Sequence, residues 1–301
     1  MLKRVLIIAN PGSGKGEAIY YADQLSRVLR QHHHSVTHTR LTTRKGDAKE
    51  WAKNAARNGY DSVICLGGDG TVNETAQGVY LSDRPVKFGF IPLGTVNDLG
   101  RALGYSMNPE RAIRDFKYVE LRKLDIAKVN DHYFINVLAI GAVPESVMLT
   151  DSKDKNRLGK LAYYKDSLSA LLNTKDYYYQ LDIDGEKYTI QSNLILIMLT
   201  NNVAGFERLF YDARYDDGLA HIVAIDGVKP TDHINALFEA AVGETKGNNF
   251  IAKTAKRIKI RNLNQSIIYS NLDGDQGPTL PLEIEVLPHA IDVLVPSGIF
   301  F

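Results

Sequence analysis

Residues 62–74 read SVICLGGDGTVNE, an apolar run followed at once by a glycine-rich turn and a helical pattern. The apolar run at 62–66 predicts a buried strand, and residues 71–81 have the spacing of a helix. Glycine lets the backbone come close to a ligand and adopt positive φ. A strand that ends in such a turn and continues as a helix is typical of a parallel α/β sheet.

The same order recurs on both sides of this stretch. We expect strands at 4–9, 35–41 and 87–92, helices at 16–30 and 46–58, and a further helix opening at Asn108-Pro109. Two more glycine-rich turns, NPGSGKG (10–16) and PLGTVND (92–98), follow predicted strands. Because the carboxyl ends of parallel strands meet at one edge of a sheet, all three turns are expected there. Their N–H groups favour anions, above all phosphate.

After about residue 125 the pattern changes to many short strands. The strand-like segments are DIAKVN, HYFINVLAI, YYYQLDID, YTIQSNLILIML, LAHIVAI, RIKIRNL, SIIYSN, LEIEVL and IDVLVP. Turn signals stand at Asn130-Asp131, Asp184-Gly185 and Asp226-Gly227, and helical stretches interrupt at about 158–172 and 231–242. Short strands joined by such turns predict a β-sandwich or a related all-β domain.

The composition is that of an ordinary globular protein. Of 301 residues 44% are hydrophobic and 24% are charged, which excludes a disordered or fibrous chain. The formal net charge of +1 gives no strong field toward nucleic acid. The single cysteine, Cys65, excludes an intrachain disulfide. The longest aliphatic run, at 194–199, is far shorter than a membrane span, so a soluble cytoplasmic protein is expected.

Common phosphate-binding motifs do not match. A P-loop requires Gly-Lys followed by Ser or Thr, and here Gly14-Lys15 precedes Gly16. The dinucleotide pattern fails as well, because Gly16 follows Gly14 one residue too early. The signatures of protein kinases are absent. The sequence therefore indicates neither a P-loop enzyme nor a protein kinase.

Six segments, in order, resemble the diacylglycerol kinase catalytic family. They are NPGSGK, GGDGTVNE, PLGTVNDLGR, RKLDIAKVN, DARYDDGLA (212–220) and NLDGDQG (271–277). The family includes bacterial diacylglycerol kinases and related lipid kinases, with sphingosine and ceramide kinases as eukaryotic relatives. The resemblance runs nearly end to end. It implies a Rossmann-like or phosphofructokinase-like α/β nucleotide domain at 1–126, with the strand at 290–301 as a candidate addition, a β-sandwich domain at 127–289, and an active site between them.

The resemblance also implies an activity. The expected reaction transfers the γ-phosphoryl group of ATP, with Mg²⁺, to the hydroxyl of diacylglycerol and gives phosphatidic acid. The expected partners are ATP and a membrane lipid, reached from the cytoplasm by peripheral membrane contact, with no nucleic acid and with a homodimer left open. Phosphoryl transfer depends mainly on positioning and charge neutralisation.

The family pattern places the nucleotide on the three turns and on one residue after the second strand. The implied residues are Asn10, Ser13, Gly14, Lys15, Thr42, Gly67, Gly68, Asp69, Gly70, Thr71, Val72, Asn73, Thr95 and Asn97. Asp69 is expected to hold the catalytic Mg²⁺ directly or through water, since Mg²⁺ prefers oxygen ligands.

Late acidic residues complete the implied site. By the resemblance, Asp273 is the general base, Asp275 stands where the family usually has Glu, and Asp125 supports the network around the active site. A second, structural Mg²⁺ is implied at DARYDDGLA, with the carbonyls of Arg214 and Leu219 and the side chain of Asp217 as ligands. The alternative for this segment is an acidic turn with Gly218 at positive φ.

Other readings stay open. The acceptor could be another lipid, such as phosphatidylglycerol or a sphingoid base, or NAD, and the chain could also be a catalytically silent nucleotide or lipid sensor. Lys253, Lys256, Arg257, Lys259 and Arg261 form a basic run that suits either a solvated sheet face or anionic headgroups. Tyr177, Tyr178 and Tyr179 alternate across a strand, which favours packing over a lipid platform.

Overall fold

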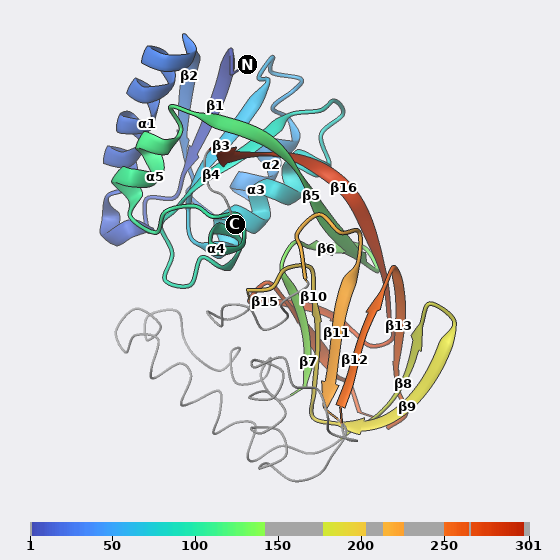
Figure 1. Cartoon of the computed structure of the whole chain (residues 1–301). Coiled ribbons are helices and arrows are strands. Elements are labelled where there is room, and N and C mark those ends of the chain that lie inside the picture. The colour runs from blue at the N-terminus through green and yellow to red at the C-terminus, as the bar shows by residue number, and fades with distance from the viewer. Residues whose placement is uncertain (1, 142–176, 203–212, 226–249, 265, 298–301) are drawn as a thin grey trace. The chain divides into compact units, whose positions relative to one another are not determined.

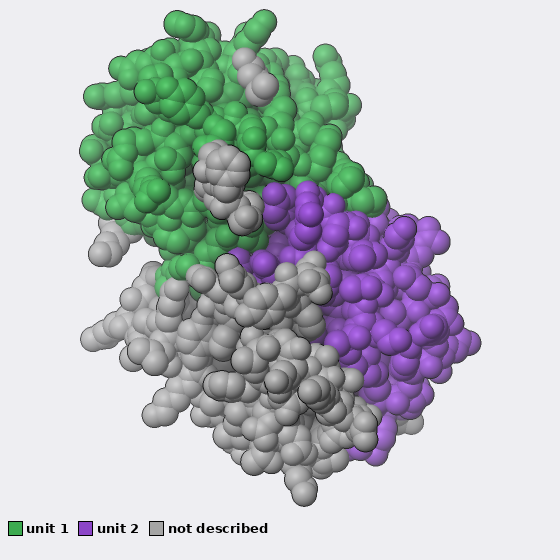
Figure 2. Space-filling model, in the orientation of Figure 1, with its two compact units in different colours: residues 1–126, 288–301 green, residues 127–287 purple. Residues whose placement is uncertain are grey.

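The computed structural model describes residues 2–141, 177–202, 213–225, 250–264 and 266–297 (Figure 1). The chain divides into two compact units, which Figure 2 colours separately: unit 1, residues 1–126 with 288–301, and unit 2, residues 127–287. Unit 1 is α/β and the described residues of unit 2 form strands, so the predicted fold class is confirmed. The predicted helices at 158–172 and 231–242 and the turn at Asp226-Gly227 lie outside the described residues.

Unit 1 contains the parallel sheet that the alternating pattern predicts. Its strands are β1 (Arg4–Ala9), β2 (Val36–Leu41), β3 (Ser62–Gly67) and β4 (Lys87–Pro92), in the order β2-β1-β3-β4 and all parallel. The residues of β3 are all buried, as expected for a strand covered on both faces.

Helices cover this sheet on both faces (Figure 1). They are η1 (Gly14–Gly16), α1 (Ala18–His33), α2 (Asp47–Lys53), α3 (Asp69–Tyr80), α4 (Asp98–Ala102) and α5 (Pro109–Asp115). Helix α1 packs against α5, and α2 packs against α3. The predicted start at Asn108-Pro109 is confirmed, because the Asn108 side chain accepts the N–H of Arg111 and caps α5. Among the described helices none is long and apolar enough to cross a bilayer.

Unit 2 is built from antiparallel strands around one core. One sheet has the order β12-β11-β10-β7-β14-β15. Its strands are β7 (Val137–Gly141), β10 (Leu194–Met198), β11 (Ala220–Ile225), β12 (Phe250–Ala255), β14 (Tyr269–Leu272) and β15 (Asp275–Thr279). The other strands are β6 (His132–Phe134), β8 (Tyr177–Ile183), β9 (Glu186–Ser192) and β13 (Arg257–Asn262). Both groups of strands supply buried side chains to this core, among them Leu138, Ile197, Leu181 and Ile260.

Two hairpins of unit 2 turn on an Asp-Gly pair. Asp184 and Gly185 join β8 to β9 with φ of 49° and 95°, and Asp273 and Gly274 join β14 to β15 with φ of 51° and 94°. Positive φ at both central residues is the type I′ turn that closes two-residue hairpins, and Asp and Gly tolerate it. The turn signal at Asp184-Gly185 is thereby confirmed.

Strand β16 (Leu282–Pro296) contributes to each unit in turn. Leu282 to Glu285 pair with β13, and Val293 pairs with Phe88 in β4. The sequence predicted two strands here, 282–287 and 291–296, whereas the structure has one. The chain adopts positive φ at His289 without ending the strand, because the buried carboxylate of Asp125 in β5 (Val119–Val129) accepts the His289 N–H at 2.6 Å.

Candidate active site

The three glycine-rich turns of unit 1 lie at the ends of three neighbouring parallel strands. Leu93 donates its N–H to the Gly67 carbonyl at 2.8 Å, which joins the second turn to the third. A Cβ added at Gly94 would lie 2.8 Å from the Cα of Gly68, and one added at Gly14 would lie 3.3 Å from the Leu93 side chain. The turns therefore meet at one sheet edge, as their positions in the sequence predict.

Asn10 fastens the first turn to the second. Its side-chain amide donates to the Thr71 hydroxyl at 3.1 Å, while its carbonyl oxygen accepts the Gly12 N–H at 3.0 Å. Ser13 donates its backbone N–H to the Asn10 carbonyl at 3.0 Å. One side chain thus fixes both the shape of the first turn and its place beside α3.

Asp69 joins the second turn to the third. It is the first residue of α3, and its two carboxylate oxygens accept the N–H groups of Asn97 and Asp98, each at 3.1 Å. Asn97 lies in the left-handed region with φ of 55°, and its side chain bonds both the N–H and the carbonyl of Gly94. The Asp69 carboxylate and the Asn97 side chain therefore fix the backbone of the third turn.

The remaining predicted nucleotide residues differ in exposure. Thr95 and Gly70 are exposed, and Ser13, Thr42 and Gly68 are partly exposed. Val72 and Asn73 are buried along α3, where Asn73 accepts the Gln77 side chain at 3.0 Å. These two residues support the helix and do not face solvent. The side chain of Lys15 lies outside what the structure describes.

Sequence reasoning missed two carboxylates that fix the loop after Thr42. Asp47 accepts the Thr43 N–H at 2.8 Å and the Arg44 N–H at 3.0 Å with one oxygen, and the Arg44 guanidinium with the other. Glu74, from GGDGTVNE, accepts the Gly46 N–H with both oxygens at 3.0 Å. The Asp three residues after an Arg was a local signal for an ion pair, whereas the Glu74 contact spans 28 residues and had no local signal.

We expect Asp47→Asn to lose stability in a way that depends on pH. Hydrogen bonds from the Thr43 backbone lead the causes that lower the pKa of Asp47 from 3.8 to about 2, although burial acts against them. Because the folded pKa is depressed, the contribution is full above the unfolded pKa and is lost as pH falls through about 2. Urea unfolding at pH 7, 4 and 2.5 should show a gap between wild type and variant that narrows with acid. A gap that stays constant would show that the carboxylate charge is irrelevant here.

Asp273 occupies the β14–β15 turn of unit 2 and binds backbone. Its carboxylate accepts the N–H groups of Ile135 at 2.8 Å, Asn136 at 3.0 Å and Val137 at 2.8 Å. Its own N–H donates to the Val137 carbonyl at 2.9 Å. These bonds stabilise the charged carboxylate and place it at the end of β7.

The same arrangement is present at the other Asp-Gly turn. The Asp184 carboxylate accepts the N–H groups of Lys256, at 3.0 Å, and Arg257, at 2.8 Å, and its N–H donates to the Arg257 carbonyl. Holding a neighbouring strand is therefore a structural task that both aspartates share. Any chemistry at Asp273 is additional to this task.

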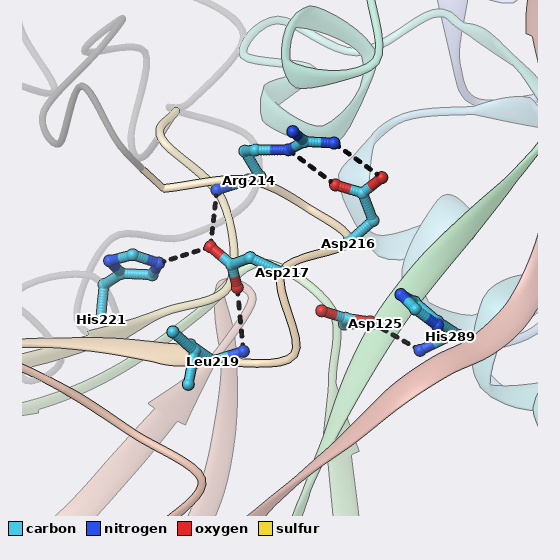
Figure 3. A network of polar contacts seen from close by, with 7 residues as sticks. All are labelled: Asp125, Arg214, Asp216, Asp217, Leu219, His221 and His289. Carbon is cyan, nitrogen blue, oxygen red and sulfur yellow. Dashed lines mark hydrogen bonds and ion pairs between the residues drawn. The ribbon is translucent and has the colours of Figure 1, made fainter.

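Asp125 and Asp275 lie in different settings. Asp125 is fully buried in β5 of unit 1, where it holds the His289 backbone (Figure 3). Asp275 opens β15 opposite Leu272 and is partly exposed. The resemblance gives Asp125 a supporting role around the site, and the observed contact shows how it shapes the long strand β16.

The segment 213–220 folds as a turn around Asp217 (Figure 3). The Asp217 carboxylate accepts the N–H groups of Arg214 at 3.0 Å and Leu219 at 2.9 Å, and contacts His221 Nε2 at 2.9 Å. Burial raises the pKa of Asp217, but the bonds from His221, Arg214 and Leu219 together lower it. Gly218 has φ of 72°, as the acidic-turn alternative expects.

The carboxylates of Asp69 and Asp217 differ in how many lone-pair positions they have left for a magnesium ion. A carboxylate offers about four lone-pair positions. Asp69 uses two of them to accept the N–H groups of Asn97 and Asp98, and Asp217 uses three, for Arg214, Leu219 and His221. Among the described residues no group of three or more His, Cys, Asp or Glu side chains could hold a metal, so waters, carbonyls or phosphates would complete either shell.

Comparison with known proteins agrees with this geometry. The family described as "Diacylglycerol kinase catalytic domain" matches residues 4–129, and the "YegS C-terminal NAD kinase beta sandwich-like domain" matches residues 144–295. The chain is 34% identical to the diacylglycerol kinase of Bacillus subtilis over 300 residues, which cover 98% of this chain and 97% of that one. It is 35% identical to a diacylglycerol kinase of Staphylococcus aureus, with 99% and 94% covered.

Solved structures give the same result. A candidate diacylglycerol kinase from Bacillus anthracis superposes with a TM-score of 0.85 at 26% identity, covering 99% of this chain and 97% of that one. Another crystal structure of a diacylglycerol kinase from that species superposes with a TM-score of 0.77 at 22% identity, which shows the fold alone. With both family models matched and full-length relatives above 30% identity, the chain belongs to the diacylglycerol kinase family of lipid kinases.

Proposed function

We propose that this chain transfers the γ-phosphoryl group of ATP to the hydroxyl of diacylglycerol and forms phosphatidic acid. The observation that carries the proposal is the joining of three glycine-rich turns at one sheet edge by Asn10 and Asp69. Such a surface offers backbone N–H groups to a polyphosphate. The names of the relatives supply the lipid class of the acceptor.

The donor belongs to unit 1 in this proposal. Helix α3 begins at Asp69, so its first N–H groups lie in the GGDGT turn, where the helix dipole favours negative charge. The Asp69 oxygens would hold Mg²⁺ directly or through water. When bound, Mg²⁺ neutralises charge on the phosphate oxygens. Asn97 keeps the Asp69 carboxylate in place by fixing the third turn.

The acceptor proton goes to Asp273 of unit 2 in this proposal. The hydroxyl becomes acidic as its oxygen bonds to phosphorus, and in a loose transition state this bond forms late, so the proton leaves late as well. A carboxylate that is held in place by hydrogen bonds can then accept this proton. The three N–H groups that bind Asp273 keep it oriented for that step.

The second Mg²⁺ would be held at the Asp217 turn. Asp217 has one lone-pair position beyond its three bonds, which suits a single direct contact to the ion, with the carbonyls of Arg214 and Leu219 as further ligands. Its part would be structural, since it would rigidify residues 213–220.

The enzyme would act from the cytoplasm at the membrane surface, and the proposal does not specify whether it is a monomer or a homodimer.

An acceptor panel tests this function. Purified protein with ATP and Mg²⁺ is offered diacylglycerol, phosphatidylglycerol, sphingosine and NAD in turn, and phosphorylated product is measured. We expect phosphatidic acid as the main product, and its loss when Mg²⁺ is chelated. If another acceptor is phosphorylated faster than diacylglycerol, that acceptor is the substrate and the proposed one is wrong. ATP binding with no product from any acceptor would support the sensor alternative.

A further inference from the structure

The described part of unit 2 exposes four large apolar or aromatic side chains, and all of them lie on or beside one loop. This inference rests on the proposed function, because a diacylglycerol acceptor lies in a bilayer. The four residues, here called the tip patch, are Tyr178, Leu263, Ile267 and Tyr269. Leu263 and Ile267 belong to the β13–β14 loop, and Ile267 is 78% exposed. Clustered exposed apolar residues mark interaction surfaces.

The loop that carries the tip patch is held in shape by its own polar groups. The Asn262 side chain donates to the Ser266 carbonyl at 2.7 Å and accepts the Asn264 N–H at 3.0 Å. Tyr178 donates its N–H to the Asn264 side chain at 2.7 Å and accepts the Leu263 N–H at 2.8 Å. These bonds give partners to the N–H groups of Tyr178, Leu263 and Asn264, which lowers the cost of bringing this edge into a medium poor in water.

The charge beside the tip patch suits an anionic surface. Arg257, Lys259 and Arg261, here called the basic stripe, lie on one face of β13 as predicted. Ile258 and Ile260 are buried on the opposite face. Two of the three cations of the stripe are paired with carboxylates. Arg257 pairs with Glu285 and Lys259 with Glu283. Arg261, the stripe residue nearest the loop, makes no ion pair within the described residues. The sequence has no acidic residue from 257 to 272, and the loop residues 263–268 carry no charge, so Arg261 is the cation beside the patch.

We propose that the tip patch, together with Arg261, docks unit 2 on an anionic lipid bilayer. Tyrosine is enriched where a membrane meets water, and two aliphatic side chains between tyrosines suit shallow insertion. Six residues of extended chain, about 20 Å, separate Ile267 from Asp273. The patch therefore anchors the protein to the surface and does not bind the acceptor hydroxyl.

Vesicle flotation tests the docking. The double variant Leu263→Ser with Ile267→Ser is compared with wild type on vesicles of phosphatidylcholine and phosphatidylglycerol. We expect binding to fall about tenfold or more, since apolar area is lost. Arg261→Gln should weaken binding about fivefold on these vesicles and not on pure phosphatidylcholine. Val36→Ser with Leu121→Ser removes exposed aliphatic residues from unit 1 and should leave binding unchanged.

Two acceptor forms separate this inference from the proposed function. The double variant should phosphorylate dissolved short-chain diacylglycerol like wild type and lose activity on diacylglycerol in vesicles. If wild type phosphorylates neither form while vesicle binding still depends on the tip patch, the proposed function fails and docking stands. Unchanged vesicle binding by the double variant overturns the docking. Light scattering that shows a wild-type dimer split by the double variant, with vesicle binding intact, assigns the patch to a second copy and also overturns it.

Discussion

Replacing Asp273 by Asn is expected to lower kcat for diacylglycerol phosphorylation at least 100-fold, with little change in the affinity for ATP. Loss of a positioned proton acceptor typically costs 10²- to 10⁴-fold. The nucleotide in our proposal binds unit 1, whereas Asp273 belongs to unit 2, so binding and turnover should separate. Steady-state kinetics with varied ATP, together with direct measurement of ATP binding, provide the check.

The chain offers a matched control for this variant. Asp184→Asn removes a carboxylate from the same type of turn with the same kind of backbone contacts. Both substitutions leave some N–H groups without a charged acceptor, so both should lower the free energy of unfolding. Only Asp273→Asn should lower kcat at least 100-fold. If the two variants kept equal activity per folded molecule, Asp273 would have a structural role alone.

Gly94→Ala is expected to raise the KM for ATP at least 100-fold. The new Cβ would lie 2.7 Å from the Asn97 side-chain oxygen and 2.8 Å from the Gly68 Cα. The second contact is with backbone, which cannot rotate away, so the second and third turns must separate. Misplacement by about 1 Å can cost about 100-fold in an active site. Kinetics and direct ATP binding measure the effect.

Gly89→Ala serves as the control for crowding within the same unit. Its Cβ would meet the side chains of Phe116 at 3.2 Å and Leu294 at 3.3 Å, away from the glycine-rich turns. Overpacking of a core typically costs 1–3 kcal/mol, so this variant should be less stable. Its KM for ATP should nevertheless stay near that of wild type. An equal rise in KM for both variants would show that the Gly94 effect is general strain.

The parts of the fold that depend on local pattern were predictable. Strands β1, β3 and β4 are apolar runs that lead into the glycine-rich turns, and the structure starts and ends each of them within one residue of the prediction. The turn at Asp184-Gly185 was predictable because few residue pairs tolerate positive φ twice in succession. Convergence of the glycine-rich turns followed from parallel strand geometry and needed no side-chain information.

The parts that depend on distant contacts were not predictable. Helix α2 ends at Lys53 and not at 58, because the chain from Asn54 to Gly59 turns toward β3, with Gly59 at positive φ. The contact of Glu74 with Gly46 joins two elements that periodicity treats separately. The roles of Asp273, Asp275 and the nucleotide residues still rest on resemblance, since geometry alone shows which backbone groups they hold.

Strand β16 has a consequence for how the protein forms during translation. Unit 1 pairs Phe88 with Val293, two residues separated by about two hundred positions in the sequence. The ribosome therefore releases the last strand of the unit 1 sheet only after all of unit 2 has been made. A nascent chain that has emerged only through residue 126 still lacks that strand. Until then the β4 edge of the sheet lacks its partner, and a premature stop before β16 would remove a strand from both units at once.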